Sequence, residues 1–138
     1  METWTRNQQF AGLSAVIYLV AGVLGFLVTG FDDFASDTDE KLLFLGLNPM
    51  HNVVHLVLGV AWGIASRSHA TARLANIALG ADLLLAFVLG VAGALPFLNI
   101  DNAAEPDNYL HLIYGAASLY IGARVVDDVV SRRAAAAA

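Results

Sequence analysis

The sequence predicts an all-α integral membrane protein that folds as a bundle of four transmembrane helices. Hydrophobic residues make up 58% of the 138 residues and charged residues 14%, against about 45–50% and about 25% in an average soluble domain. The apolar residues form four runs, each long enough to cross a hydrocarbon core of about 30 Å, and the charges lie almost entirely between the runs. Because unpaired backbone polar groups are costly in lipid, runs of this length are expected to be helical.

The first two runs cover residues 10–29 and 49–66. The first is longer than the core of a signal peptide, which has about 7–15 residues, and no small-residue cleavage site follows Thr29. We therefore expect a retained helix. The second run begins with Asn48 followed by Pro49, which is typical of an N-cap and a first helical turn.

The third and fourth runs cover residues 74–97 and 107–126. The third is expected to end near Pro96, and the fourth to begin at the segment Glu105-Pro106-Asp107. The four runs together predict one domain over residues 1–133, and residues 134–138 form a low-complexity alanine tail.

The distribution of Lys and Arg predicts the orientation. Only Lys41 lies in the connection between the first and second runs or between the third and fourth. The other basic residues lie near the termini or between the second and third runs: Arg6, Arg67, Arg73, Arg124, Arg132 and Arg133. Because cytoplasmic segments carry an excess of Lys and Arg, both termini are expected in the cytoplasm.

The chain contains an internal repeat. The second and fourth predicted helices share the pattern N-x-x-H-L-x-x-G, at Asn52–Gly59 and at Asn108–Gly115. A weaker similarity relates Gly22–Gly25 in the first helix to Phe87–Gly90 in the third. A duplicated helical hairpin accounts for both, and the two hairpins would run in the same direction as parallel repeats.

The repeat also aligns a group of possible metal ligands. His51 and His55 are four residues apart and therefore share one face of the second helix. Asp107 and His111 occupy the equivalent positions of the fourth. If these two helices are neighbours, three imidazoles and one carboxylate meet near the outer membrane face, a set that suits Zn²⁺ or another divalent transition metal.

The same cluster allows other interpretations. Haem could be held between His55 and His111 as axial ligands. The histidines could instead form hydrogen bonds between helices that only set the helix register, and we favour this use. Asn52 and Asn108 could orient metal-bound imidazoles by hydrogen bonds. His69 is expected to be a solvated loop residue.

Asp82 is the carboxylate expected well inside a predicted helix. An ionisable residue at that depth is costly and suggests a function such as a proton or cation pathway. Because a pathway would use more than one such carboxylate, we favour a hydrogen bond from a tyrosine or serine of a neighbouring helix.

The composition excludes several classes of function. The absence of cysteine excludes disulfides, thiolate metal ligands and iron–sulfur clusters. The sequence has no basic patch interleaved with aromatic residues, so a nucleic-acid partner is not expected. It has no nucleophile motif, no phosphate-binding glycine loop and no paired carboxylates expected inside a cleft, so an enzyme is not expected.

The motif N-P-x-H-N-x-x-H at Asn48–His55, with Asp107–Leu112 later in the chain, resembles an uncharacterised family of four-helix membrane proteins from bacteria, largely actinobacteria. The resemblance covers most of the chain. It implies a multi-pass protein of the bacterial plasma membrane with no established activity, and it assigns no functional residues.

We therefore expect a non-catalytic accessory or structural membrane protein that contacts the lipid bilayer and associates with itself or with a larger membrane complex. One alternative is a metal- or haem-binding redox or sensory protein that uses the histidine cluster. Another is a small ion or proton transporter that uses Asp82.

Overall fold

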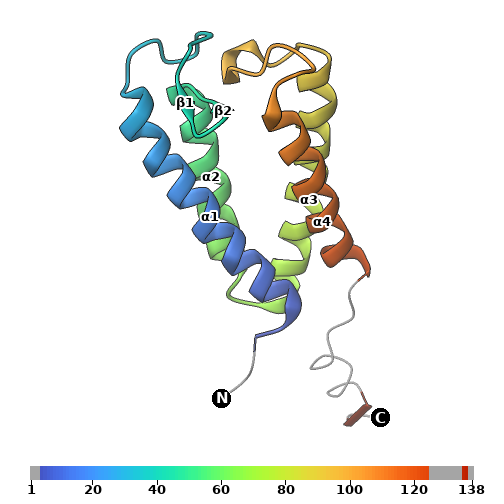
Figure 1. The fold of residues 1–138 in the computed structure, drawn as a ribbon. Helices are drawn as coiled ribbons and strands as arrows, with labels where there is room; N and C mark the ends of the chain where they lie inside the picture. Colours follow the sequence, from blue (N-terminus) through green and yellow to red (C-terminus); the bar gives the residue numbers. More distant parts are fainter. Residues whose placement is uncertain (1–3, 125–134, 137–138) are drawn as a thin grey trace.

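A computed structural model describes residues 4–124 and 135–136 of the chain. The fold consists of four α-helices and short connecting elements (Figure 1). The helices are α1 (Arg6–Thr29), α2 (Pro49–Ala65), α3 (His69–Val91) and α4 (Pro106–Arg124). The antiparallel strands β1 (Lys41–Leu42) and β2 (Leu45–Gly46) lie between α1 and α2, and a short 3₁₀ helix, η1 (Pro96–Leu98), precedes α4.

The four helices form two hairpins. Helix α1 packs chiefly against α2, and α3 packs chiefly against α4. The hairpins lie side by side and run in the same direction (Figure 1). The segments that close them, with β1 and β2 in one and η1 in the other, lie at the same end of the molecule. The turn between α2 and α3 lies at the opposite end.

Two helices begin earlier than predicted because of side-chain caps. Thr5 and Gln8 form a capping box that starts α1 at Arg6. The side chain of Ser68 accepts a hydrogen bond from the backbone N–H of Thr71 and starts α3 at His69. The prediction of a solvated loop at His69 is therefore wrong, and its Nδ1 lies 3.1 Å from Thr5 Oγ1. The predicted start of α2 after the Asn48 cap is confirmed.

Helix α3 also ends earlier than predicted, at Val91 rather than residue 97. The backbone at Gly93 takes a left-handed conformation with φ of +68°, which ends the helix. Pro96 then begins η1. Helix α2 ends at Ala65, one residue before its predicted end. The predicted end of α4, at residue 126, lies outside the described residues. So do Arg132, Arg133 and most of the alanine tail.

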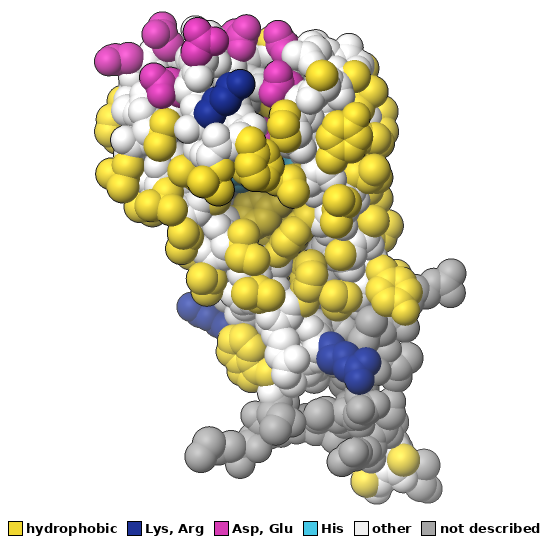
Figure 2. Space-filling model, viewed as in Figure 1, with side chains coloured by type: hydrophobic (Ala, Val, Ile, Leu, Met, Phe, Trp, Pro, Cys, Tyr) yellow, Lys and Arg dark blue, Asp and Glu magenta, His cyan; other side chains and the backbone are white. Residues whose placement is uncertain are grey.

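The molecule has an apolar exterior over its helices and an interior that contains polar side chains. Its surface over the helices is largely apolar, as Figure 2 shows for one face. Helices α1 and α3 are each long and apolar enough to cross a membrane, and α2 is a shorter apolar helix. The interior includes a core of apolar side chains, among them Tyr18, Leu58 and Trp62. It also contains these buried polar residues: Asn7, Ser14, Asn52, Asn76, Asn108 and Ser118.

The two hairpins make matching contacts where the repeat predicts equivalent positions. A Cβ atom added at Gly25 of α1 would clash with Oδ1 of Asn52, and one added at Gly90 of α3 would clash with Oδ1 of Asn108. In each hairpin, an asparagine side chain therefore lies directly against the backbone of a glycine in the other helix.

A second matching pair lies at the other end of the hairpins. Gln8 of α1 donates to the Ser66 carbonyl at 3.1 Å, and Arg73 of α3 donates to the Gly122 carbonyl at 3.0 Å. These positions are related by the same offsets in sequence as the glycine and asparagine pairs.

Candidate metal site

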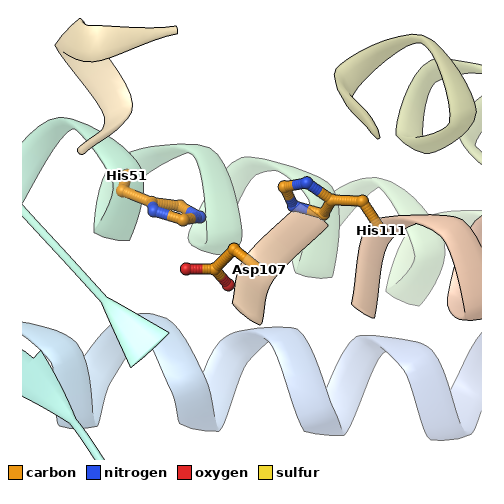
Figure 3. Close-up of side chains that lie close together, drawn as sticks. All are labelled: His51, Asp107 and His111. Atoms are coloured by element: carbon orange, nitrogen blue, oxygen red, sulfur yellow. The ribbon is translucent and has the colours of Figure 1, made fainter. Parts of the chain in front are cut away.

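Three side chains from two helices meet between the hairpins. His51 lies in the first turn of α2, and Asp107 and His111 lie in the first two turns of α4. Each offers one ligand atom, and these atoms all lie within 4.8 Å of one another. Figure 3 shows the Asp107 carboxylate between the two imidazole rings. Among the described residues this is the one set of three or more possible metal ligands.

The three side chains are buried, with exposed fractions of 1% for His51, 3% for Asp107 and 8% for His111. Within the described part of the chain, Nδ1 of His51, Nδ1 of His111 and Oδ2 of Asp107 have no hydrogen-bond partner. A buried polar atom without a partner costs about 1–3 kcal/mol. These atoms are therefore available to a ligand.

His55 lies next to the site but outside the set. Its ring centroid is 4.5 Å from that of His51, and it meets Tyr18 edge to face at 5.3 Å. Its Nδ1 is also buried without a hydrogen-bond partner among the described residues. The structure thus brings together three of the four predicted ligands and places the fourth beside them.

The two predicted orienting asparagines have other partners. Asn52 donates to Thr29 Oγ1 at 2.8 Å, and Asn108 donates to the Asn102 carbonyl at 2.9 Å. Neither amide donates to an imidazole in the described structure. The backbone carbonyls of Gly46 and Leu98 instead lie close enough to His51 to interact with its ring.

Asn48 joins both connecting segments over the site. Its side chain accepts from the backbone N–H of His51 at 2.9 Å. Its amide donates to the carbonyls of Ser36 and Phe97, each at 2.9 Å. The Asn48-Pro49 pattern predicts that Asn48 caps a helix. The bond to Phe97 joins residues 49 positions apart, so no local sequence pattern predicts it.

Two pockets flank the cluster. The α1–α4 pocket has a volume of about 200 Å³ and is lined from α1, α4, β2 and α2. The α2–α3 pocket has a volume of about 170 Å³ and includes Asp82 in its lining. His55, His111 and Tyr18 border both pockets. The ligand cluster therefore separates two cavities.

Asp82 lies well inside α3, as predicted from the sequence. Its side chain is exposed, and within the described residues it accepts no hydrogen bond from a tyrosine or serine. Because α3 begins at His69, Asp82 also lies farther from that end of the helix than the sequence suggested.

Comparison with known proteins identifies one match. Residues 8–124 match the sequence model of a family described as Domain of unknown function (DUF4383). No curated protein and no solved structure matches the chain. The match spans all four helices and fits the expected resemblance to an uncharacterised family, but it supplies no activity.

Proposed function

The chain belongs to this family of unknown function, and we propose that it is a multi-pass membrane protein that binds one divalent transition-metal ion between α2 and α4. The observation that carries the proposal is the convergence of three buried ligand atoms from His51, Asp107 and His111. Two imidazoles and one carboxylate form a donor set that suits Zn²⁺ and Fe²⁺.

The distances are compatible with this proposal. Two atoms bonded to one tetrahedral zinc at about 2.0–2.1 Å lie about 3.3–3.4 Å apart. The present set, with separations up to 4.8 Å, needs to close by up to about 1.5 Å, which side-chain rotation can supply. The carbonyls of Gly46 and Leu98 near His51 are acceptors of the type that orient metal-bound imidazoles.

The interpretation favoured from the sequence, in which the histidines serve as interhelical hydrogen-bonding groups, has less support. Two other polar contacts between the helices are formed: Trp62 donates to Asn76 Oδ1 at 3.1 Å, and Tyr114 donates to Ser14 Oγ at 2.8 Å. The histidine Nδ1 atoms lack such partners among the described residues. This contrast favours a ligand-binding role for the cluster.

The proposed membrane location rests on the apolar exterior and the polar side chains of the interior, the reverse of the arrangement in a soluble protein. Soluble proteins rarely expose large contiguous apolar surfaces, whereas polar groups inside a membrane bundle join its helices. Acidic side chains gather at the end that carries β1 and β2, and arginines lie toward the other end (Figure 2). This charge distribution favours a bacterial plasma-membrane protein with Arg6, Arg67 and Arg73 on the cytoplasmic side.

The proposal includes a duplicated hairpin as the origin of the fold. The matching contacts of Asn52 with Gly25 and of Asn108 with Gly90 support it. A duplication also accounts for a central site to which both copies contribute ligands near the start of equivalent helices, since His51 is the equivalent of Asp107.

Haem binding, ion transport and an accessory role in a larger complex stay predictions. A Soret band in the purified protein would reveal haem. Loss of ion flux in liposomes on Asp82→Asn would support transport. None of these three roles has the support of a converging ligand set.

Zinc titration of the purified protein in detergent tests the metal proposal. We expect one ion per chain for the wild type and a loss of affinity of about 100-fold or more for His111→Ala, since even residues that only orient ligands contribute about 10–100-fold. His69→Ala, which removes an imidazole at the far end of α3, is the control and should bind like the wild type. Binding below one ion per two chains, or an equal loss in the control, would contradict the proposal.

A further inference from the structure

We infer that the α1–α4 pocket binds a molecule with a single aromatic ring and an oxygen donor, and that this oxygen occupies a coordination position of the metal. The inference rests on the proposed metal site. Three protein ligands leave at least one position of a tetrahedral ion open. Asp107 and His111 border this pocket, so a molecule inside it can reach that position.

The side chains that line the pocket favour the binding of an aromatic ring. Four of its side chains are themselves rings, and the others are apolar apart from Asp107: Ile17, Tyr18, Ala21, Leu45, His55, Asp107, Leu110, His111 and Tyr114. The Tyr18 and Tyr114 rings meet at 5.5 Å and 62°. Such edge-to-face arrangements suit a further aromatic ring.

Apart from its two tyrosines, the polar residues of the pocket lining are Asp107, His55 and His111, at or beside the proposed metal site. Asp107 Oδ2 and the Nδ1 atoms of His55 and His111 are buried and have no partner among the described residues. The Tyr114 hydroxyl, in contrast, is already bonded to Ser14. A molecule in the pocket therefore meets largely apolar walls, with the proposed metal ligands Asp107 and His111 in its lining.

The size of the pocket limits the occupant. Its volume is about 200 Å³. An apolar cavity of about 150 Å³ takes up benzene, and pockets for drug-sized ligands begin at about 300 Å³. The pocket thus fits one ring with its oxygen substituent.

The α2–α3 pocket is the repeat-related equivalent of this one, also lies between the two hairpins, and has different side chains at the positions that matter for ring binding. Leu83 replaces Tyr18, Leu58 replaces Tyr114, and Asp82 replaces Ile17. The α2–α3 pocket therefore lacks the Tyr114 ring, although Tyr18 borders both pockets, and it has the carboxylate of Asp82 where the first pocket has Ile17. Ala21 and Ala86 occupy equivalent positions in the two pockets, which provides a matched pair for substitution.

The pocket opens on the apolar exterior. Figure 2 shows it as a hollow bordered by hydrophobic side chains, with histidine visible at its edge. In a membrane this opening faces lipid. The ring can therefore come from a free phenol-like compound or from the head of a lipid-borne ring molecule, and a chain-bearing probe separates these sources.

The test uses the full-length protein in lipid nanodiscs, loaded with Co²⁺, whose visible absorption reports its ligands. Benzohydroxamate carries a ring and metal-binding oxygens, and acetohydroxamate carries the same oxygens without the ring. Ala21→Phe fills the α1–α4 pocket, and Ala86→Phe fills the equivalent pocket as the control. Leu110→Phe is a second variant in the first pocket. Benzohydroxamate with an octyl chain identifies a lipid-borne ring if it binds more tightly than the unsubstituted probe.

We expect Ala21→Phe to weaken benzohydroxamate binding at least about tenfold and to change acetohydroxamate binding by less than about twofold, with Ala86→Phe leaving both unchanged. Equal binding of the two probes by the wild type would overturn the inference, as would a loss confined to Ala86→Phe. A Co²⁺ spectrum that responds to acetohydroxamate alone would contradict this inference and leave the metal site intact. Absence of any Co²⁺ spectrum would contradict the metal site itself.

Discussion

The imidazole of His55 lies beside the metal-binding set without being part of it. It contacts the rings of His51 and Tyr18, and its position between the two pockets suits a side chain that shapes the site. We predict that His55→Ala keeps one zinc ion per chain with an affinity change below about tenfold, whereas His51→Ala lowers the affinity by about 100-fold or more. Calorimetric titration of the two variants measures the difference. Equal losses would make His55 a fourth ligand.

Much of the candidate site could be predicted from single residues. The spacing of four between His51 and His55, and the match of that pair to Asp107 and His111, place the residues in two pairs of matched depth, about one helical turn apart. Which of them converge depends on how α2 and α4 are rotated about their axes. That rotation is set by close packing between distant residues, such as Gly115 against Gly80, and no local pattern records it.

At the scale of the element, the caps at opposite ends of the molecule should have different effects. Asn48 caps α2 and also bonds to Ser36 and Phe97, whereas Ser68 caps α3 alone, by bonding to Thr71. We predict that Ser68→Ala lowers the free energy of unfolding by about 0.5–2 kcal/mol and leaves zinc affinity unchanged. Asn48→Ala should cost more, because it leaves two carbonyls unpaired, and should also weaken zinc binding.

Denaturant unfolding and zinc titration of both cap variants provide the two readouts. If Asn48→Ala were no more costly than Ser68→Ala, or if both left zinc affinity unchanged, the connecting segments would have no part in holding the site.

The glycines that contact the hairpin asparagines give a second prediction for the elements. In Gly25→Ala and Gly90→Ala the new methyl group would clash with Asn52 and Asn108 respectively. We predict that each lowers the free energy of unfolding by about 1–3 kcal/mol, as expected for overpacking. Gly63→Ala is the control, because its Cβ would lie 3.5 Å from the nearest atom. Losses that differ greatly between Gly25→Ala and Gly90→Ala would argue against equivalent hairpins.

The existence of the four helices could be predicted from hydropathy, but their ends could not be predicted equally well. The Asn48-Pro49 signal was strong and correct. The starts of α1 and α3 depend on Thr5 and Ser68, whose caps precede the apolar runs by several polar residues. The end of α3 depends on the left-handed conformation at Gly93. Hydropathy alone does not predict these caps or this left-handed residue.

At the scale of the whole molecule, the proposed topology predicts which surfaces face the outside of the cell. The chain contains no cysteine, so single cysteines can be labelled without background. We predict that Ser36→Cys, near β1, reacts with a membrane-impermeant maleimide in intact cells. Ala70→Cys, in the first turn of α3, should react only after the membrane is permeabilised. The reverse pattern, or labelling of both in intact cells, would contradict the proposed orientation.

The central claim is that two histidines and one aspartate from the two hairpins hold a single metal ion. X-ray absorption spectroscopy of the zinc-loaded protein at the zinc edge tests it most directly, because it detects the bonded atoms and the imidazole rings behind them. The predicted result is a first shell of nitrogen and oxygen at about 2.0–2.1 Å with outer scattering from two imidazoles, reduced to one imidazole in His111→Ala. A spectrum without imidazole scattering, or one that His111→Ala leaves unchanged, would contradict the claim.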